Sequence, residues 1–218
     1  MYVLGLTGSI AMGKSTVAQM FRDIHIPVHD ADASVHSLYQ GKAAPLIERE
    51  FPGTTDRGVV DRRRLGDIVL NDPEALKRLE NLIHPLVRER EQDFVNHARR
   101  DQAPFVVLDI PLLFETGAER RLDGVIVVTA DPAEQERRVL SRPGMTPEKF
   151  RAILSRQIPD NEKRAKADFI IDTHSVVDAP ESELFEKNMT ATRSRVGEIA
   201  DQIISRQWLP ARVRKPGN

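Results

Sequence analysis

The sequence predicts an α/β fold in which a five-stranded parallel sheet lies between layers of helices. Five short apolar runs supply the strands, and helical stretches separate them: residues 2–6, 26–28, 105–108, 124–129 and 169–171. These runs do not alternate with polar residues, and four of them are rich in Val and Ile, which is typical of parallel strands buried on both faces. Strands that alternate with helices indicate a doubly wound sheet.

Several helix starts carry a capping side chain followed by proline. The cap accepts a hydrogen bond from a free N–H group of the first turn, and proline at the first helical position needs no N–H. Three such pairs occur, Asp72-Pro73, Asp131-Pro132 and Thr146-Pro147. Further helices are predicted over residues 15–23 and, as one long amphipathic helix, over 181–207.

A long segment between the second and third strands is predicted to be wholly helical. Residues 34–100 contain no strand-like run, and they break at Pro52-Gly53 and at Asn71-Asp72-Pro73. One crossover between parallel strands needs far fewer residues. We therefore expect an inserted helical domain over residues 33–100.

Composition excludes several classes of protein. Of the 218 residues, 40% are hydrophobic, and 32 Lys and Arg balance 33 Asp and Glu to a net charge of −1. This balance excludes a chain-wide polycation for nucleic acid, and the lack of cysteine excludes disulfides and thiolate metal sites. Apolar runs shorter than ~18 residues and an N-terminus without a basic flank predict neither a membrane span nor a signal peptide. We expect a soluble, cytoplasmic protein.

Residues 8–15, GSIAMGKS, fit the phosphate-loop pattern G-x-x-x-x-G-K-[ST]. They follow the first strand and lead into a helix, the context in which the pattern is specific. Gly8 and Gly13 permit backbone arrangements that a side chain would forbid. The amides of residues 11–16 then point at phosphate oxygens. Lys14 supplies a cation for the β- and γ-phosphates of ATP, and the Ser15 hydroxyl can bind Mg²⁺.

Seven residues of the predicted nucleotide site come from this one short stretch of chain. They are Gly8, Ala11, Met12, Gly13, Lys14, Ser15 and Thr16. A phosphate loop alone does not separate a kinase from a GTPase, a motor or a binding module, so the acceptor must be read from other residues.

Asp30 and Asp32 directly follow the second strand. Ligands of open α/β sheets bind beyond the carboxyl ends of the strands. If the segment is extended, residues two apart point the same way, and both carboxylates can face the γ-phosphate. A carboxylate there can orient an acceptor hydroxyl and take its proton. The alternative is that one of the two only caps the next helix.

The third strand also ends in an acid, Asp109, a position that in phosphate-loop proteins often belongs to the Mg²⁺ shell. Pro111 would stiffen the turn that follows. Leu112, with Leu113 and Phe114, would form an apolar wall for the acceptor, or else ordinary loop packing.

Residues 137–166 are locally basic, with nine Lys and Arg against three Asp and Glu. They read as helix, a turn at Pro143-Gly144, and helix. Positive charge held over a triphosphate stabilises the transferring group, and a lid excludes water. Arg142 and Arg156 are the best candidates for contacts with the triphosphate. The alternative is that the segment is only a solvated helix face.

The sequence divides into three predicted parts. They are a nucleotide-binding core (1–32, 101–136 and 167–210), the inserted domain (33–100) and a lid (137–166).

A series of motifs, in this order and spacing, resembles the dephospho-CoA kinase family. They are residues 8–16, Asp30-Ala31-Asp32, Asp61-Arg62 with Leu65, His84-Pro85-Leu86, residues 111–115, Arg156-Gln157 and Ala167-Asp168.

The resemblance implies ATP-dependent phosphorylation of the 3′-hydroxyl of the dephospho-CoA ribose, the last step of coenzyme A synthesis. It implies that the inserted domain binds CoA, with Leu65 and His84 among the acceptor contacts, although a lone histidine is more often a packed or capping residue. The base proposed in the family maps onto Asp32. Ser9, Ala11 and Met12 depart from the usual Gly, Gly and Ser, and Met12 is expected to place a large apolar side chain near the phosphates.

Three rival functions differ from this one in their acceptor or in their sequence motifs. Another small-molecule kinase would phosphorylate a different acceptor, such as a nucleoside monophosphate. A guanine switch needs Asn/Thr-Lys-x-Asp after a strand, whereas the fourth strand ends Val128-Thr129-Ala130-Asp131. A nucleic-acid-dependent NTPase needs a broad basic face, whereas the basic charge is confined to residues 137–166. We expect ATP and dephospho-CoA as partners and no nucleic acid or membrane, with the oligomeric state open.

Overall fold

The computed structural model describes residues 1–174 and 181–210, which divide into two compact units. The first comprises the described residues of Met1–His29 and Ala98–Asn218, and the second comprises Asp30–His97. Each is described by itself. No helix in the described part of the chain has the length and apolar character that crossing a membrane requires.

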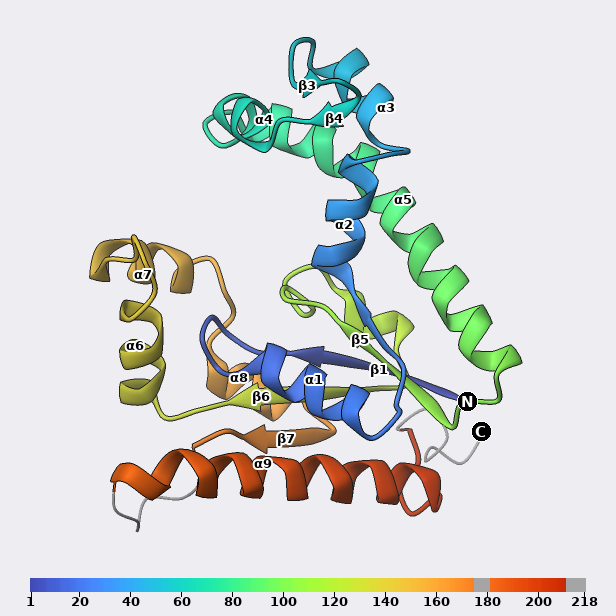
Figure 1. Ribbon diagram of the computed structural model, residues 1–218, viewed down its shortest axis with the longest axis vertical. Helices are drawn as coiled ribbons and strands as arrows, with labels where there is room; N and C mark the ends of the chain where they lie inside the picture. Colours follow the sequence, from blue (N-terminus) through green and yellow to red (C-terminus); the bar gives the residue numbers. More distant parts are fainter. Residues whose placement is uncertain (175–180, 211–218) are drawn as a thin grey trace, which may run out of the picture. The chain divides into compact units, whose positions relative to one another are not determined.

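A five-stranded sheet forms the centre of the first unit, with strand order β2-β5-β1-β6-β7 (Figure 1). The strands are β1 (Tyr2–Thr7), β2 (Val28–Asp30), β5 (Phe105–Asp109), β6 (Gly124–Thr129) and β7 (Phe169–Asp172). β1 pairs in parallel with β5 and β6, and β6 pairs in parallel with β7. Every residue of β5 and β6 is buried, which explains their unbroken apolar sequence. The predicted α/β fold with a five-stranded parallel sheet is confirmed.

Helices α1 (Lys14–Asp23) and α9 (Glu181–Ile204) pack against each other on one face of this sheet (Figure 1). Phe21 of α1 and Ile199 of α9 are fully buried there with Leu4 and Ile126 of the sheet. The remaining helical segments of this unit are 3₁₀ helix η1 (Ala118–Arg121), α6 (Pro132–Leu140), α7 (Pro147–Leu154) and α8 (Asp160–Ala165).

The second strand lies two residues later than predicted. Ile26 is buried, but its N–H donates to the Phe21 carbonyl and so completes the end of α1. His25 before it has φ 62°, and Pro27 after it has no N–H to give to a sheet. Regular strand structure therefore begins only at Val28.

The second unit has its own core, made of helices and a small hairpin. Its elements are α2 (Ala31–Tyr39), α3 (Ala44–Glu50), β3 (Thr55–Asp56), β4 (Val59–Val60), α4 (Arg62–Val69) and most of α5 (Pro73–Arg100). The prediction of an all-helical segment was wrong at the hairpin, where Thr55 pairs with Val60. Arg57 and Gly58 both have positive φ (49° and 79°), as a tight hairpin turn requires.

The predicted caps are present. Asp72 accepts from the Glu74 and Ala75 amides, Asp131 from Ala133, and Thr146 from Lys149. Residues 137–166 contain one helix more than predicted, because α8 follows α7 after a short break. α9 ends at Ile204, three residues before the predicted end.

Candidate functional site

The phosphate loop connects β1 to α1, and its two glycines are required for different reasons. A Cβ at Gly8 would lie 2.6 Å from the Val128 carbonyl oxygen of the neighbouring strand, so no side chain fits. Gly13 has φ 89°, a left-handed conformation, and its Cα faces the Thr173 side chain. The backbone of the loop is therefore pressed against the carboxyl ends of β6 and β7.

Ala11 also adopts a left-handed conformation, with φ 62°. The prediction that Met12 places its side chain near the phosphates was wrong. Met12 is 3% exposed and packs into the core of the sheet, where its sulfur accepts a hydrogen bond from the Ala130 N–H. The space that this thioether fills lies inside the protein, so its size does not narrow the outer face of the loop.

Lys14 begins α1, and its ammonium forms an ion pair with the Asp109 carboxylate at the end of β5. Asp109 is 5% exposed, and the Lys14 side chain is also mostly buried. β1 and β5 are adjacent in the sheet, with Leu6 opposite Asp109, and this register brings the two residues together. The two residues that the sequence assigned to phosphate and metal thus contact each other.

Ser15 and Thr16 follow in the first turn of α1, and both are exposed. The Ser15 hydroxyl and the Asp109 carboxylate are oxygen donors of the kind that Mg²⁺ prefers. Within the described ranges no three His, Cys, Asp or Glu side chains gather as a metal-binding group. The residues therefore fit a magnesium ion that completes its coordination with phosphate oxygens and water, and not one held by the protein alone.

Three side chains outside the predicted site residues bind the backbone of the loop. Gln157 accepts from the Ile10 N–H (3.2 Å), and Gln135 donates to the Ile10 carbonyl (2.8 Å). The Thr173 hydroxyl lies 3.0 Å from the Met12 carbonyl. Arg138 donates to the Thr173 hydroxyl oxygen and carbonyl, so it supports the loop indirectly.

The loop after β5 is held to α8 by a buried ion pair. Lys163 Nζ lies 2.9 Å from Glu115 Oε1, and its side chain is fully buried. Burial would raise the pKa of Glu115, but Lys163 and the Ile158 N–H together lower it below its ordinary value. Of the predicted apolar wall, Leu113 and Phe114 are buried, whereas Leu112 is 43% exposed.

Pro111 is half-buried, and its carbonyl accepts a hydrogen bond from the Thr7 hydroxyl (3.1 Å). Arg142 and Arg156 are exposed, and neither guanidinium forms a hydrogen bond or ion pair with a described residue. They are available to an anion.

Four predicted site residues lie in the second unit. Asp30 caps α2 by accepting from the Ala33 N–H, and its contact with the acceptor stays a prediction. Asp32 lies in the first turn of α2 and is exposed, so the assumption of an extended segment was wrong. His84 is exposed on α5. Leu65 is 3% exposed and packs in the core of this unit, so it has a structural role. Its contact with the acceptor stays a prediction.

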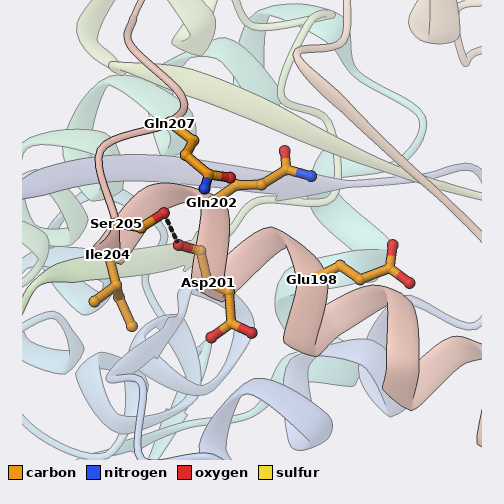
Figure 2. Close-up of a pocket in the computed structure, with 6 residues that line it drawn as sticks. All are labelled: Glu198, Asp201, Gln202, Ile204, Ser205 and Gln207. Atoms are coloured by element: carbon orange, nitrogen blue, oxygen red, sulfur yellow. Dashed lines mark hydrogen bonds between the residues drawn. The ribbon is translucent and has the colours of Figure 1, made fainter.

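A separate surface hollow, with a volume of about 480 Å³, lies at the end of α9 (Figure 2). Its lining residues are Glu198, Asp201, Gln202, Ile204, Ser205 and Gln207. None of the predicted site residues lines it.

Comparison with known proteins gives a consistent result. The family model described as "Dephospho-CoA kinase" matches residues 2–179. A dephospho-CoA kinase of Rhizobium meliloti is 55% identical over 184 residues, which cover 84% of this chain and 95% of that protein. A dephospho-CoA kinase of Mesorhizobium japonicum is 58% identical over 184 residues, covering 84% and 93%.

Solved structures agree. The protein TT1252 of Thermus thermophilus superposes with a TM-score of 0.74 at 35% identity, over 91% of this chain and 95% of that one. Dephospho-CoA kinase of Campylobacter jejuni superposes with a TM-score of 0.62 at 26% identity, over 93% and 97%. Because the family model covers most of the chain, and relatives more than half identical are covered almost completely, the chain is an enzyme of the dephospho-CoA kinase family.

Proposed function

We propose that the chain transfers the γ-phosphoryl group of ATP to the 3′-hydroxyl of the dephospho-CoA ribose, giving coenzyme A and ADP. The observation that carries the proposal is the phosphate loop itself. Gly8 leaves no room for a side chain, Gly13 has a left-handed backbone, and Lys14 stands beside a buried acid, in a chain whose family match spans residues 2–179.

In this proposal ATP lies along the loop. The amides of residues 11–16, with Thr16 in the first turn of α1, surround the phosphates at the positive end of that helix. Lys14 moves from Asp109 to the β- and γ-phosphates, where its charge has more to neutralise. The Ser15 hydroxyl and the released Asp109 carboxylate would hold Mg²⁺, which supplies neutralisation of the phosphate charge when bound.

The acceptor hydroxyl is oriented by Asp32. Its proton passes to this carboxylate while the oxygen bonds to the γ-phosphorus, and the bond to the β–γ bridging oxygen breaks with ADP as leaving group. Asp30, as the cap of α2, fixes the turn that carries Asp32. His84, Leu65, Pro111 and Leu112 are the further acceptor contacts in this proposal.

Arg142 and Arg156 would neutralise the γ-phosphoryl group as it moves. Their support is that both are exposed and neither is engaged by a described residue, unlike Arg138. Residues 137–166 act as the lid in this proposal, and residues 33–100 as the CoA-binding domain.

The test of the reaction is direct. Purified protein is mixed with Mg-ATP and dephospho-CoA, and the product is sought by mass spectrometry at the mass of coenzyme A. Shikimate, gluconate and nucleoside monophosphates serve as alternative acceptors. Phosphorylation of one of these in place of dephospho-CoA would contradict the proposal.

Asp32→Asn tests the base. We expect kcat to fall by roughly 10²–10⁴-fold, because the amide cannot take the proton, while the Kd for ATP is unchanged. Asp56→Asn, another exposed acid of the second unit, is the matched control and should leave kcat unchanged. Near-normal turnover of Asp32→Asn would reject its role.

A further inference from the structure

The peptide groups of Ile10 are bound on both sides by glutamine side chains. The Ile10 N–H donates to Gln157 Oε1 at 3.2 Å, and the Ile10 carbonyl accepts from Gln135 Nε2 at 2.8 Å. The two glutamines lie 147 and 125 residues away in sequence. We call this pair, Gln135 and Gln157, the glutamine clamp.

Both members of the clamp are themselves held in place. Gln135 lies in α6 and is only 6% exposed, so its side chain has little freedom to move. Gln157 lies between α7 and α8, and the next residue, Ile158, donates its N–H to Glu115 Oε1 (2.9 Å). Lys163 of α8 anchors Glu115 in turn. The clamp therefore transmits the position of α6 and α8 to the tip of the phosphate loop.

The loop needs such support because of the residue that follows. Ala11 has φ 62°, a conformation that costs an ordinary L-residue about 1–2 kcal/mol, and glycine much less. Such a conformation persists only when its surroundings determine it. Here Ile10 is bound by the clamp on one side of Ala11, and Met12 is bound by Thr173 and Ala130 on the other.

We propose that Gln135 and Gln157 are positioning residues of the phosphate loop, which fix the Ile10 peptide and so preset the loop amides for the phosphates of ATP. The proposal rests on the proposed ATP site. It assigns the clamp no contact with the reacting atoms. The clamp would favour ATP binding through preorganisation, since a loop already in its binding geometry loses less entropy when the ligand binds.

The first test reads the contact itself, in the protein without nucleotide. Hydrogen exchange of the Ile10 amide is followed by NMR in the wild type and in Gln157→Met, which keeps the length of the side chain and removes the acceptor. We expect exchange to accelerate roughly fivefold or more, the factor that corresponds to one ordinary hydrogen bond. Gln157→Glu restores an acceptor and should restore slow exchange. Unchanged exchange in Gln157→Met would overturn the proposal.

The second test reads the consequence. Calorimetric titration with Mg-ATP should give a Kd that is raised roughly fivefold in Gln157→Met and in Gln135→Met. Steady-state kinetics of the same variants should give an unchanged KM for dephospho-CoA. Gln92→Met, an exposed glutamine on α5, makes the same chemical change and should alter neither quantity. Faster exchange with an unchanged ATP Kd would also overturn the proposal, because the contact would then be only structural. ATP binding with no phosphorylation of dephospho-CoA would refute the proposed acceptor and leave the clamp intact.

Discussion

Single residues of the phosphate loop are constrained by close backbone contacts that the consensus pattern alone does not reveal. Gly8 is required because its Cα faces a carbonyl oxygen of β6, not because its φ is unusual. Ala11 shows the reverse situation, an L-residue in a left-handed conformation with room for its Cβ. The pattern G-x-x-x-x-G-K-[ST] therefore combines two different demands, close approach and unusual dihedral angles.

Gly8→Ala tests the close approach. The new Cβ would lie 2.6 Å from the Val128 carbonyl oxygen, so a strand or the loop must shift. We expect a loss of stability of about 1–3 kcal/mol, the usual cost of overpacking, measured by urea unfolding at constant m-value.

Gly197→Ala is the matched control. Gly197 lies within α9, and a Cβ there meets no atom within 4 Å. Alanine should raise helix stability by about 0.5–1 kcal/mol. Equal effects of the two substitutions would contradict the argument from close approach.

At the scale of elements, local patterns predicted most of the fold. The apolar runs gave the strands of the sheet to within two residues, because burial on both faces leaves a strong composition signal. The β3–β4 hairpin was missed because each strand has only two residues, too few for periodicity to appear. α8 was missed because Pro159, in place of an Asp or Ser cap, precedes it.

Helix α6 carries a cluster of ion pairs that the sequence alone did not indicate. Glu134 lies 2.6 Å from both Arg137 Nη2 and Arg138 Nε, and Arg138 continues to Thr173 beside the phosphate loop. The hydrogen bond from Arg137 lowers the pKa of Glu134 most, burial raises it, and the hydrogen bond from Arg138 lowers it again. The result is a pKa of about 2.

Glu134→Gln should change the acid sensitivity of the protein. A carboxyl with a lowered pKa contributes stability above its unfolded pKa of 4.5 and loses it as the pH falls toward about 2. The wild type should therefore lose stability between about pH 4.5 and pH 2, and the variant should lose less over that interval. Urea unfolding at several pH values measures the slope.

The control for this prediction is Glu136→Gln. Glu136 is an exposed glutamate of the same helix and forms no ion pair with a described residue. Its removal should leave the acid slope as in the wild type. An identical slope in Glu134→Gln and in the wild type would show that the ion pairs of Glu134 do not contribute.

At the scale of the whole molecule, the sequence marks the predicted site better than the residues that support it. Lys14 and Asp109 could be proposed because a local pattern and a strand end mark them, and the structure places the two in contact. The loop-binding roles of Gln135, Gln157 and Thr173 were not predicted, because a side chain that binds the backbone of a distant loop leaves no local periodicity. Met12 was misplaced for a related reason: whether a loop residue points outward or into the core depends on the dihedral angles of its neighbours.

The two units have separate apolar cores, which leads to a prediction about their stability. One core is formed by the sheet with α1 and α9, and the other by residues between Leu38 and Val87 of the second unit. A ligand stabilises only the cooperative unit that binds it, by about 2.7 kcal/mol at a hundred times its Kd.

Mg-ATP at that concentration should slow hydrogen exchange of core amides of the first unit, such as Leu6 and Ile126, by about a hundredfold. Amides of the second core, such as Ile47 and Leu65, should exchange at their former rate, because their opening does not release the nucleotide. Adenosine, which lacks the phosphates that the loop is proposed to bind, should have no effect on either core. Equal slowing of both cores by Mg-ATP would mean that the two units unfold together, and their separate cores would then not behave as separate cooperative units.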